Sequence, residues 1–225
     1  MPNPDNGQEK EVLDAYPPDK PMPLYKYTTW IIGWLFYGLY RLKIIKGKES
    51  LPESGGFIVA SNHISFADPI FIRFANKRQI RYMAKAELFR NPVTRWFCKG
   101  YGAFPVERGS ADSSALETAA DILNSGKVLG IFPEGTRSKD GKIGRGKSGT
   151  IYLAYHADKP IYPCAVYSKR KPLSPFSCYT IAFGEPVTVQ ELGVTTCTGR
   201  EMRDATRRLM EIISDLQEEC RRARE

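Results

Sequence analysis

A histidine and an aspartate lie five positions apart in the run Asn62-His63-Ile64-Ser65-Phe66-Ala67-Asp68, directly after the apolar stretch 57–60. At this spacing, the carboxylate of Asp68 can reach the imidazole of His63 across a turn that opens a helix. A carboxylate that accepts a hydrogen bond from one ring nitrogen fixes the tautomer and leaves the other nitrogen free to take a proton. We therefore expect His63 to act as a general base and Asp68 to orient it.

Two further polar loops follow apolar stretches and distinguish this histidine from one that merely sits in a helix cap. They are the stretches 102–109 (G-A-F-P-V-E-R-G) and 132–138 (F-P-E-G-T-R-S). In parallel α/β sheets, ligands collect at the carboxyl ends of the strands, so three polar loops at that edge describe one site. Such a site would hold a base, the cations Arg108 and Arg137, and a glycine turn whose amides bind an oxyanion.

The sequence shows no activated nucleophile to accompany this base. No serine stands in a G-x-S-x-G elbow, because residues 146–150 read G-K-S-G-T. Cys98 and Cys164 lie in apolar stretches, where cysteine is usually a small core residue. The histidines and cysteines lack the spacing of zinc ligands, so no metal site is expected. We therefore expect His63 to activate a hydroxyl group of the substrate itself.

Short apolar stretches alternate with helical patterns along the chain. The stretches expected to form strands are 57–60, 80–83, 103–106, 128–132, 161–166 and 179–183. Apolar residues at helical spacing lie between them, and a charged amphipathic helix is expected at the end of the chain. This alternation predicts an α/β fold, with a single domain built on a mixed, mostly parallel sheet flanked by helices. A chain of 225 residues can bury the core of one such domain.

The stretch 141–148 reads G-K-I-G-R-G-K-S and matches the written form of a nucleotide-binding P-loop. A P-loop begins where its strand ends, so that loop amides and a helix N-terminus converge on phosphate. Here the strand expected over 128–132 ends well before Gly141, and no later apolar strand ends in an aspartate that would hold magnesium. The sequence therefore favours a surface turn over an ATPase or GTPase site.

The first part of the chain is expected to stand apart from the catalytic domain, which we assign to residues 46–225. Residues 1–24 are polar, proline-rich and without a signal peptide, which indicates a flexible leader. Residues 25–45 contain an aromatic run, Trp30–Tyr40, that is too short for a membrane span of about 20 residues. Because Trp and Tyr beside lysines suit a membrane interface, we expect an amphipathic, aromatic interfacial helix. The alternative is a buried helix that packs on the domain.

The formal net charge of +8 points to an anionic partner. Lys and Arg do not alternate with aromatic residues in the order of a nucleic-acid recognition motif, so no nucleic acid is expected and an anionic membrane surface is favoured. The five cysteines are scattered and none forms a C-x-x-C pair, which indicates a reducing cytosol. We expect a peripheral, monotopic protein on the cytoplasmic face of a membrane.

Four motifs, in this order, resemble those of the 1-acylglycerol-3-phosphate acyltransferase family of glycerolipid enzymes. They are N-H-x-x-x-x-D at 62–68, G-x-x-P-V-x-R-G at 102–109, F-P-E-G-T-R-S at 132–138 and a Tyr-Pro stretch at 161–166. The resemblance covers roughly residues 50–190 and implies that His63 is the base and Asp68 its orienter. It also implies a set of substrate-binding residues: Lys85 and Arg108 for the substrate phosphate, and Glu134, Gly135, Thr136 and Arg137 for the acceptor site and oxyanion pocket.

The resemblance further implies a reaction. A fatty acyl group would pass from acyl-CoA or an acyl-carrier protein to the sn-2 hydroxyl of lysophosphatidic acid (1-acyl-sn-glycerol 3-phosphate), giving phosphatidic acid without a metal or other cofactor. Two alternatives stay open: an acyltransferase acting on glycerol 3-phosphate or another lysophospholipid, and a catalytically silent membrane-binding module. Lys85 together with Arg108 favours a phosphomonoester acceptor, and the presence of both His63 and Asp68 favours an enzyme.

Overall fold

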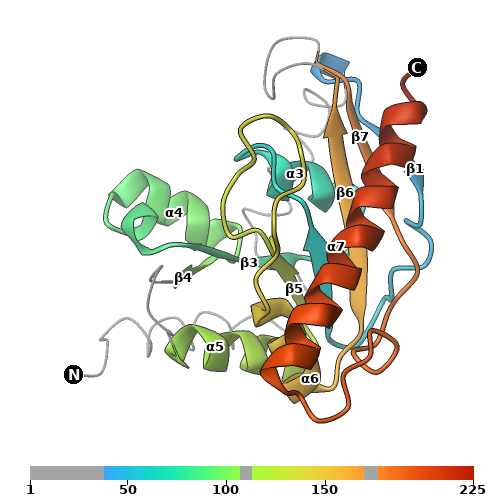
Figure 1. Cartoon of the computed structure of the whole chain (residues 1–225). Coiled ribbons are helices and arrows are strands. Elements are labelled where there is room, and N and C mark those ends of the chain that lie inside the picture. Colours follow the sequence, from blue (N-terminus) through green and yellow to red (C-terminus); the bar gives the residue numbers. More distant parts are fainter. Residues whose placement is uncertain (1–37, 107–112, 170–176) are drawn as a thin grey trace.

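The computed structural model describes residues 38–106, 113–169 and 177–225, which form a seven-stranded sheet covered by helices (Figure 1). Across the sheet, the strands are β1 (Lys43–Lys46), β7 (Tyr179–Phe183), β6 (Ile161–Ser168), β2 (Phe57–Ser61), β5 (Val128–Ile131), β3 (Ile80–Lys85) and β4 (Phe104–Val106). Neighbouring strands run parallel, except that β6 and β7 are antiparallel. The mixed, mostly parallel α/β sheet expected from the sequence is confirmed.

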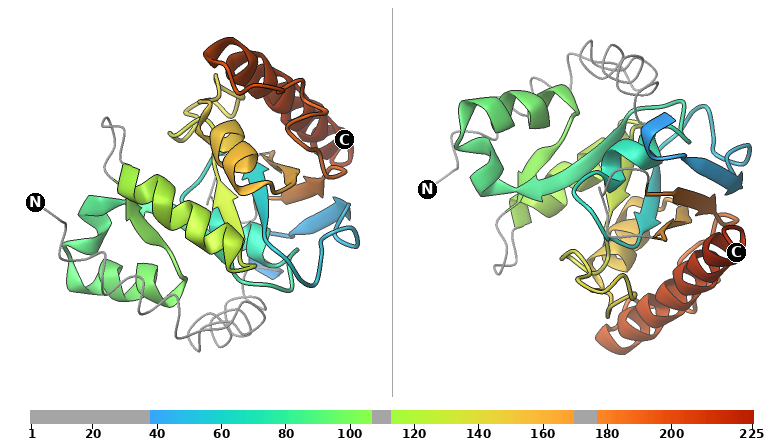
Figure 2. Two further views of the ribbon diagram at one scale, coloured as in Figure 1. Left: turned by 90° about the horizontal axis from the view of Figure 1, so that it is seen from below. Right: turned by 90° about the horizontal axis from the view of Figure 1, so that it is seen from above.

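Helices cover both faces of the sheet (Figure 2). They are α3 (Asp68–Arg73), the 3-10 helix η1 (Ala86–Phe89), α4 (Pro92–Gly100), α5 (Ser113–Asn124), α6 (Gly149–Ala157) and α7 (Gly199–Arg222). Buried residues of α5, α6 and α7 share one hydrophobic cluster with the sheet, and buried residues of α3 share a second cluster on the other face.

The central position of β2 in the sheet explains why its sequence is one apolar stretch. Ile58 and Ala60 belong to the cluster under α5, α6 and α7, whereas Phe57 and Val59 belong to the cluster under α3. Successive side chains of a strand point to opposite faces, and here both faces are covered. The strand therefore has no polar side, and it lies at the middle of the sheet, between β6 and β5.

The six strands expected from the sequence are all present, and the structure adds β1 at the edge of the sheet. The prediction of an interfacial helix over residues 25–45 is wrong at its C-terminal end, because residues 43–45 belong to the strand β1. Tyr40 is a core residue, since its ring contacts the rings of Phe71 and Tyr179 edge-on at centroid distances of 5.6 and 5.9 Å. Residues 1–37 lie outside the described residues, so the leader and the rest of that helix stay predictions.

The helix expected from Glu87 toward Lys99 is interrupted after η1. Asn91 caps α4, because its side-chain oxygen accepts hydrogen bonds from the amides of Val93 at 2.9 Å and Thr94 at 3.3 Å. Pro92 follows at the first helical position, where its missing amide proton has no cost. The sequence Asn-Pro therefore ends one helix and starts another.

The C-terminal helix α7 is present as expected. It begins with a capping box, in which Thr198 and Glu201 each accept a hydrogen bond from the other's backbone amide. Leu209, Ile213 and Leu216 on its apolar face are buried against the sheet. No helix within the described ranges is long and apolar enough to span a bilayer.

Candidate active site

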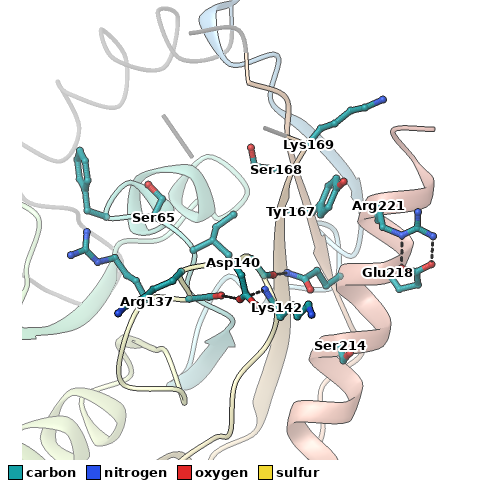
Figure 3. A pocket seen from close by; sticks show the side chains of 16 residues that line it. Ser65, Arg137, Asp140, Lys142, Tyr167, Ser168, Lys169, Ser214, Glu218 and Arg221 are labelled. Carbon is teal, nitrogen blue, oxygen red and sulfur yellow. Dashed lines mark hydrogen bonds and ion pairs between the residues drawn. The ribbon is translucent and has the colours of Figure 1, made fainter. Parts of the chain in front are cut away.

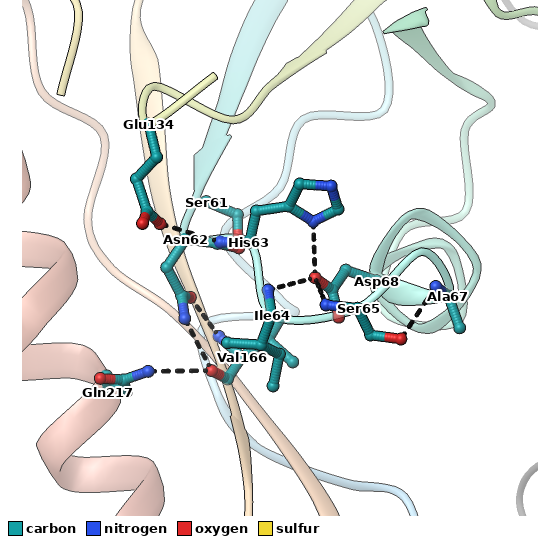
Figure 4. A network of polar contacts seen from close by, with 10 residues as sticks. All are labelled: Ser61, Asn62, His63, Ile64, Ser65, Ala67, Asp68, Glu134, Val166 and Gln217. Atoms are coloured by element: carbon teal, nitrogen blue, oxygen red, sulfur yellow. Dashed lines mark hydrogen bonds and ion pairs between the residues drawn. The ribbon is translucent and has the colours of Figure 1, made fainter. Parts of the chain in front are cut away.

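His63 and Asp68 lie at the carboxyl end of β2, the edge of the sheet where ligands collect in α/β folds (Figure 4). Nδ1 of His63 is 2.7 Å from Oδ2 of Asp68, which is the first residue of α3. That distance is typical of a charge-assisted hydrogen bond. The contact expected from the spacing is therefore present, and the catalytic roles of the two residues remain a prediction.

Asp68 is held in place by the backbone of the same loop. Its Oδ2 atom also accepts hydrogen bonds from the amides of Ile64 and Ser65, each at 2.7 Å, and the side chain is fully buried. Oδ2 already accepts from two amides, and a carboxylate oxygen can only accept, so we assign the ring proton of His63 to Nδ1. Nε2 then carries a free lone pair, and the side chain is 16% exposed, which leaves it accessible to a substrate.

Asn62 ties this loop to the neighbouring strand β6. Its side-chain amide donates to the carbonyl of Val166 at 2.9 Å, and its carbonyl oxygen accepts from the amide of Val166 at 2.7 Å. Gln217 of α7 donates to the same Val166 carbonyl at 3.4 Å (Figure 4). The asparagine before the histidine therefore positions the loop through backbone contacts and does not itself face the base.

The Glu134 side chain contacts the backbone of two loops. Oε1 accepts from the amide of His63, and Oε2 accepts from the amide of Gly144, each at 3.0 Å. The residue is buried, and its carboxylate joins the two loops. Glu134 therefore holds the backbone at His63, and its expected role at the acceptor site stays a prediction.

The ring of His63 belongs to an aromatic stack that the sequence does not reveal. Phe132 lies parallel to the imidazole at a centroid distance of 4.0 Å, and Tyr82 of β3 stacks on Phe132 at 5.5 Å. Gly130 makes room for this stack, because a Cβ atom there would lie 2.2 Å from Cε1 of Tyr82. Hydrogen bonding to Asp68 and stacking on Phe132 together fix the orientation of the base.

The turn at Gly135, where an oxyanion pocket is expected, lies beside this stack, and that role stays a prediction. The Gly135 amide already donates to the carbonyl of Phe132 at 2.9 Å, so it closes the turn. Its φ of +69° suits glycine, and a Cβ atom there would lie 3.2 Å from Nζ of Lys147. The structure thus brings the ammonium group of Lys147 next to the turn, where a positive charge can stabilise an oxyanion. Thr136 and Arg137 follow as exposed residues.

The three cations expected to bind the substrate, Lys85, Arg108 and Arg137, lie in different surroundings. Lys85 ends β3 and forms an ion pair with Glu87 at 2.7 Å, which partly satisfies its charge. The hydrogen bond with Lys85 lowers the pKa of the Glu87 carboxyl. Arg137 has no ion-pair partner among the described residues. Arg108 lies outside the described residues.

The loop that resembles a P-loop is folded back on the strand that precedes it. The amide of Lys147 donates to the carbonyl of Pro133 at 2.8 Å, and the amide of Gly144 donates to Glu134. These amides are therefore engaged within the protein and do not form a cradle for phosphate, which agrees with the surface turn expected from the sequence.

The described ranges give no support to a reactive cysteine or to a metal site. Burial raises the pKa of the Cys98 and Cys164 thiols, which disfavours the reactive thiolate form. No group of three or more His, Cys, Asp or Glu side chains that could hold a metal occurs among the residues described.

Comparisons with known proteins indicate the family of this chain. The family model described as Acyltransferase matches residues 43–167, more than half of the chain. The 1-acyl-sn-glycerol-3-phosphate acyltransferase of Bacillus subtilis (strain 168) is 35% identical over 147 residues, which cover 64% of this chain and 72% of that relative. This chain belongs to the 1-acyl-sn-glycerol-3-phosphate acyltransferase family. It is therefore an acyltransferase.

Further members of the acyltransferase family are similar over the same core. The 1-acyl-sn-glycerol-3-phosphate acyltransferase beta of Homo sapiens is 34% identical over 149 residues, which cover 61% of this chain and 52% of the human protein. This acyltransferase thus spans about half of the human relative. The crystal structure of the 1-acyl-sn-glycerophosphate (LPA) acyltransferase PlsC from Thermotoga maritima matches with a TM-score of 0.65 and 24% identity, over 97% of this chain and 84% of that one. That likeness shows the same fold.

Proposed function

We propose that this acyltransferase moves a fatty acyl group from an acyl thioester to the sn-2 hydroxyl of 1-acyl-sn-glycerol 3-phosphate, giving phosphatidic acid and a free thiol. The observation that carries the proposal is the 2.7 Å contact between Nδ1 of His63 and Oδ2 of Asp68, at the edge of the sheet where ligands collect. Relatives that bear the name of this enzyme supply the acceptor. The donor is acyl-CoA or an acyl-carrier protein.

The proposed mechanism uses His63 twice. Nε2 takes the proton of the sn-2 hydroxyl as its oxygen attacks the thioester carbonyl. The tetrahedral intermediate then collapses, the carbon–sulfur bond breaks, and the imidazolium returns the proton to the departing sulfur. Asp68 stabilises the imidazolium while the proton is held. This direct transfer forms no acyl-enzyme and uses no cofactor.

The remaining site residues are proposed to bind charge. Lys147, whose ammonium group lies next to the turn at Gly135, would stabilise the oxyanion, where one well-placed donor is worth about 10²–10³ in rate. Lys85, with Arg108, would bind the phosphate of the acceptor, and Thr136 and Arg137 would shape the acceptor site. Lys85 would exchange its ion pair with Glu87 for the substrate phosphate, which suits a lysine at an exposed strand end.

A thiol-release assay tests the proposed reaction. Purified protein is mixed with acyl-CoA or acyl-carrier protein and with one acceptor at a time: 1-acyl-sn-glycerol 3-phosphate, glycerol 3-phosphate or lysophosphatidylcholine. We expect thiol release and phosphatidic acid with the first acceptor. Activity only with glycerol 3-phosphate or with lysophosphatidylcholine would replace this proposal with the alternative acceptor. The absence of thiol release with every pair would favour a silent membrane-binding module, a reading that the intact pair of His63 and Asp68 disfavours.

We also propose that the protein works as a peripheral protein on an anionic membrane surface, on the cytoplasmic face. The support comes from the outward side of η1 and α4, where Leu88, Val93, Trp96 and Phe97 are between 39% and 73% exposed. Arg90, Arg95 and Lys99 lie among them in the sequence. Apolar side chains interspersed with cations suit the boundary between acyl chains and anionic head groups. All five cysteines are free, as in a reducing compartment.

Removing two of these apolar side chains should weaken membrane binding. In the double variant Val93→Ser and Trp96→Ser, we expect the partition coefficient onto phosphatidylglycerol vesicles to fall at least about tenfold, because each buried side chain contributes on the order of 1.5–3 kcal/mol. Vesicle sedimentation measures this loss. The control Tyr152→Ser changes an exposed aromatic side chain on α6, away from this surface, and should sediment like the unchanged protein. Equal loss in both variants would contradict α4 as the contact surface.

A further inference from the structure

The loop between β5 and α6, residues 132–148, holds the backbone of the base on both sides. The amide of Ser138 donates to the carbonyl of His63 at 2.7 Å. The amide of His63 donates to Oε1 of Glu134 at 3.0 Å, and Oε2 of the same carboxylate accepts from the amide of Gly144 at 3.0 Å. The position of the base therefore depends on where this β5–α6 loop lies.

The β5–α6 loop runs beside the C-terminal helix α7 in both views of Figure 2. Nε2 of Gln217 on α7 donates to the carbonyl of Gly141 in the loop at 3.1 Å. Lys142 of the loop and Ser214 of α7 both line a groove of about 940 Å³ (Figure 3). The segment that holds the base is thus supported from outside by a helix that contributes no side chain to the pair of His63 and Asp68.

The loop approaches α7 closely at Gly146, the glycine before the lysine in the stretch that resembles a P-loop. A Cβ atom on Gly146 would lie 2.8 Å from Cγ and 2.9 Å from Sδ of Met210, and 2.9 Å from Cγ2 of Thr206. Carbon atoms in contact are about 3.5–4.0 Å apart, so a side chain at this position would push the loop and the helix apart. Met210 and Thr206 are both buried, which leaves them little room to yield. The glycine is therefore explained by contact with α7.

We propose that the contact of Gly146 with Thr206 and Met210, here called the α7 contact, positions the base His63. The inference rests on the proposed acyl transfer, in which Nε2 of His63 takes the proton of the acceptor hydroxyl. Thr206 and Met210 are buried and do not reach the reacting atoms. They are positioning residues, which act on the reaction through the β5–α6 loop.

The α7 contact reaches the base through a short series of bonds. Gly144 lies two residues before Gly146, and its amide donates to the carboxylate of Glu134, which accepts from the amide of His63. Lys147 follows Gly146 directly, and its amide donates to a carbonyl at the start of the loop. A loop displaced from α7 would therefore move both the backbone of the base and the ammonium group of Lys147. A misplacement of about 1 Å at a reacting group can cost about 10² in rate.

The variant Gly146→Ala tests the α7 contact, because the φ angle of Gly146 lies outside the left-handed region and an alanine there is limited by space alone. We expect kcat to fall about tenfold and the KM for the acceptor to change by less than about twofold, since no substrate contact is removed. In a proton–nitrogen NMR spectrum, the amide proton of His63 should move upfield, because its hydrogen bond to Glu134 lengthens. The control Gly149→Ala adds the same methyl group three residues later, where it has open space, and should behave as the unchanged protein.

A compensating variant separates positioning from stability. It combines Gly146→Ala with Thr206→Ser and Met210→Ala, which remove the atoms that the new methyl group would meet. Thr206→Ser keeps the hydroxyl that donates to the carbonyl of Met202 at 2.6 Å. We expect kcat to return to within about twofold of the unchanged protein, because residues in contact compensate for one another, and the His63 amide resonance to return with it. The urea midpoint should fall below that of Gly146→Ala, since a buried methionine is truncated.

The NMR measurement needs no substrate, so it tests the α7 contact separately from the reaction. A His63 resonance that moves in Gly146→Ala and returns in the compensating variant, in a protein that releases no thiol with any acceptor, would support the contact and reject the proposed reaction. A His63 resonance that stays in place in Gly146→Ala would overturn the contact. Turnover as low in the compensating variant as in Gly146→Ala, or an equal loss in Gly149→Ala, would overturn it as well.

Discussion

Replacement of His63 by alanine is expected to lower turnover by at least about 10², the low end of what a general base contributes. The reason is that Nε2 is the free ring nitrogen: Nδ1 is engaged with Asp68 at 2.7 Å. The loop itself should persist, because its backbone is held by Glu134 and by Asn62 through bonds that do not involve the imidazole. Steady-state thiol release under saturating donor and acceptor measures the effect.

Two controls separate loss of the base from loss of the fold. The variant loses the stacking contact of His63 on Phe132, worth about 0.5–1.5 kcal/mol, so the unfolding midpoint should move by only a few degrees. His156→Ala removes the other histidine of the chain, whose ring contacts Tyr152 on α6 at a centroid distance of 4.2 Å, and should leave turnover unchanged. Turnover of His63→Ala within about twofold of the unchanged protein would remove His63 from the mechanism.

The sequence predicts those parts of this molecule that depend on local pattern. The six apolar stretches become strands because strands covered on both faces must be apolar throughout. The pair of His63 and Asp68 is visible because both residues belong to one turn. By contrast, β1 escapes prediction because its short pattern gains strand structure only from pairing with β7, which is formed by residues far along the chain.

The rest of the site depends on contacts that leave little mark on side-chain patterns. Glu134 accepts hydrogen bonds from the backbone amides of His63 and Gly144. Almost every residue type has a backbone amide, so these partners cannot be recognised from the sequence. The stack of Tyr82, Phe132 and His63 combines side chains from separate loops and strands, and its one sequence signal is a glycine inside an apolar strand, Gly130, where a close approach is common. The groove beside the site is likewise lined by four separate segments, at residues 64–66, 137–142, 167–169 and 214–221, which only the fold brings together.

Replacement of Asp68 by asparagine is expected to lower turnover by about 10², less than the about 10⁴ found where such a change reverses the histidine tautomer. In the unchanged protein, Oδ2 of Asp68 accepts hydrogen bonds from the amides of Ile64 and Ser65, each at 2.7 Å. An asparagine NH₂ group at the Oδ2 position would face two amide donors. The asparagine oxygen must therefore occupy the Oδ2 position. That oxygen still accepts from Nδ1 of His63, and the tautomer is kept. Turnover falls because the imidazolium loses the negative charge beside it.

The same geometry predicts a cost in stability. With the asparagine oxygen at the Oδ2 position, its NH₂ group occupies the place of Oδ1, which is buried and accepts no hydrogen bond from the described residues. A buried donor without a partner costs about 1–3 kcal/mol, which urea unfolding measures. Nitrogen-15 NMR of the His63 ring should show the proton on Nδ1 in both proteins. A proton on Nε2 in Asp68→Asn, together with a loss of about 10⁴, would show that the backbone amides do not fix the asparagine and that Asp68 alone sets the tautomer.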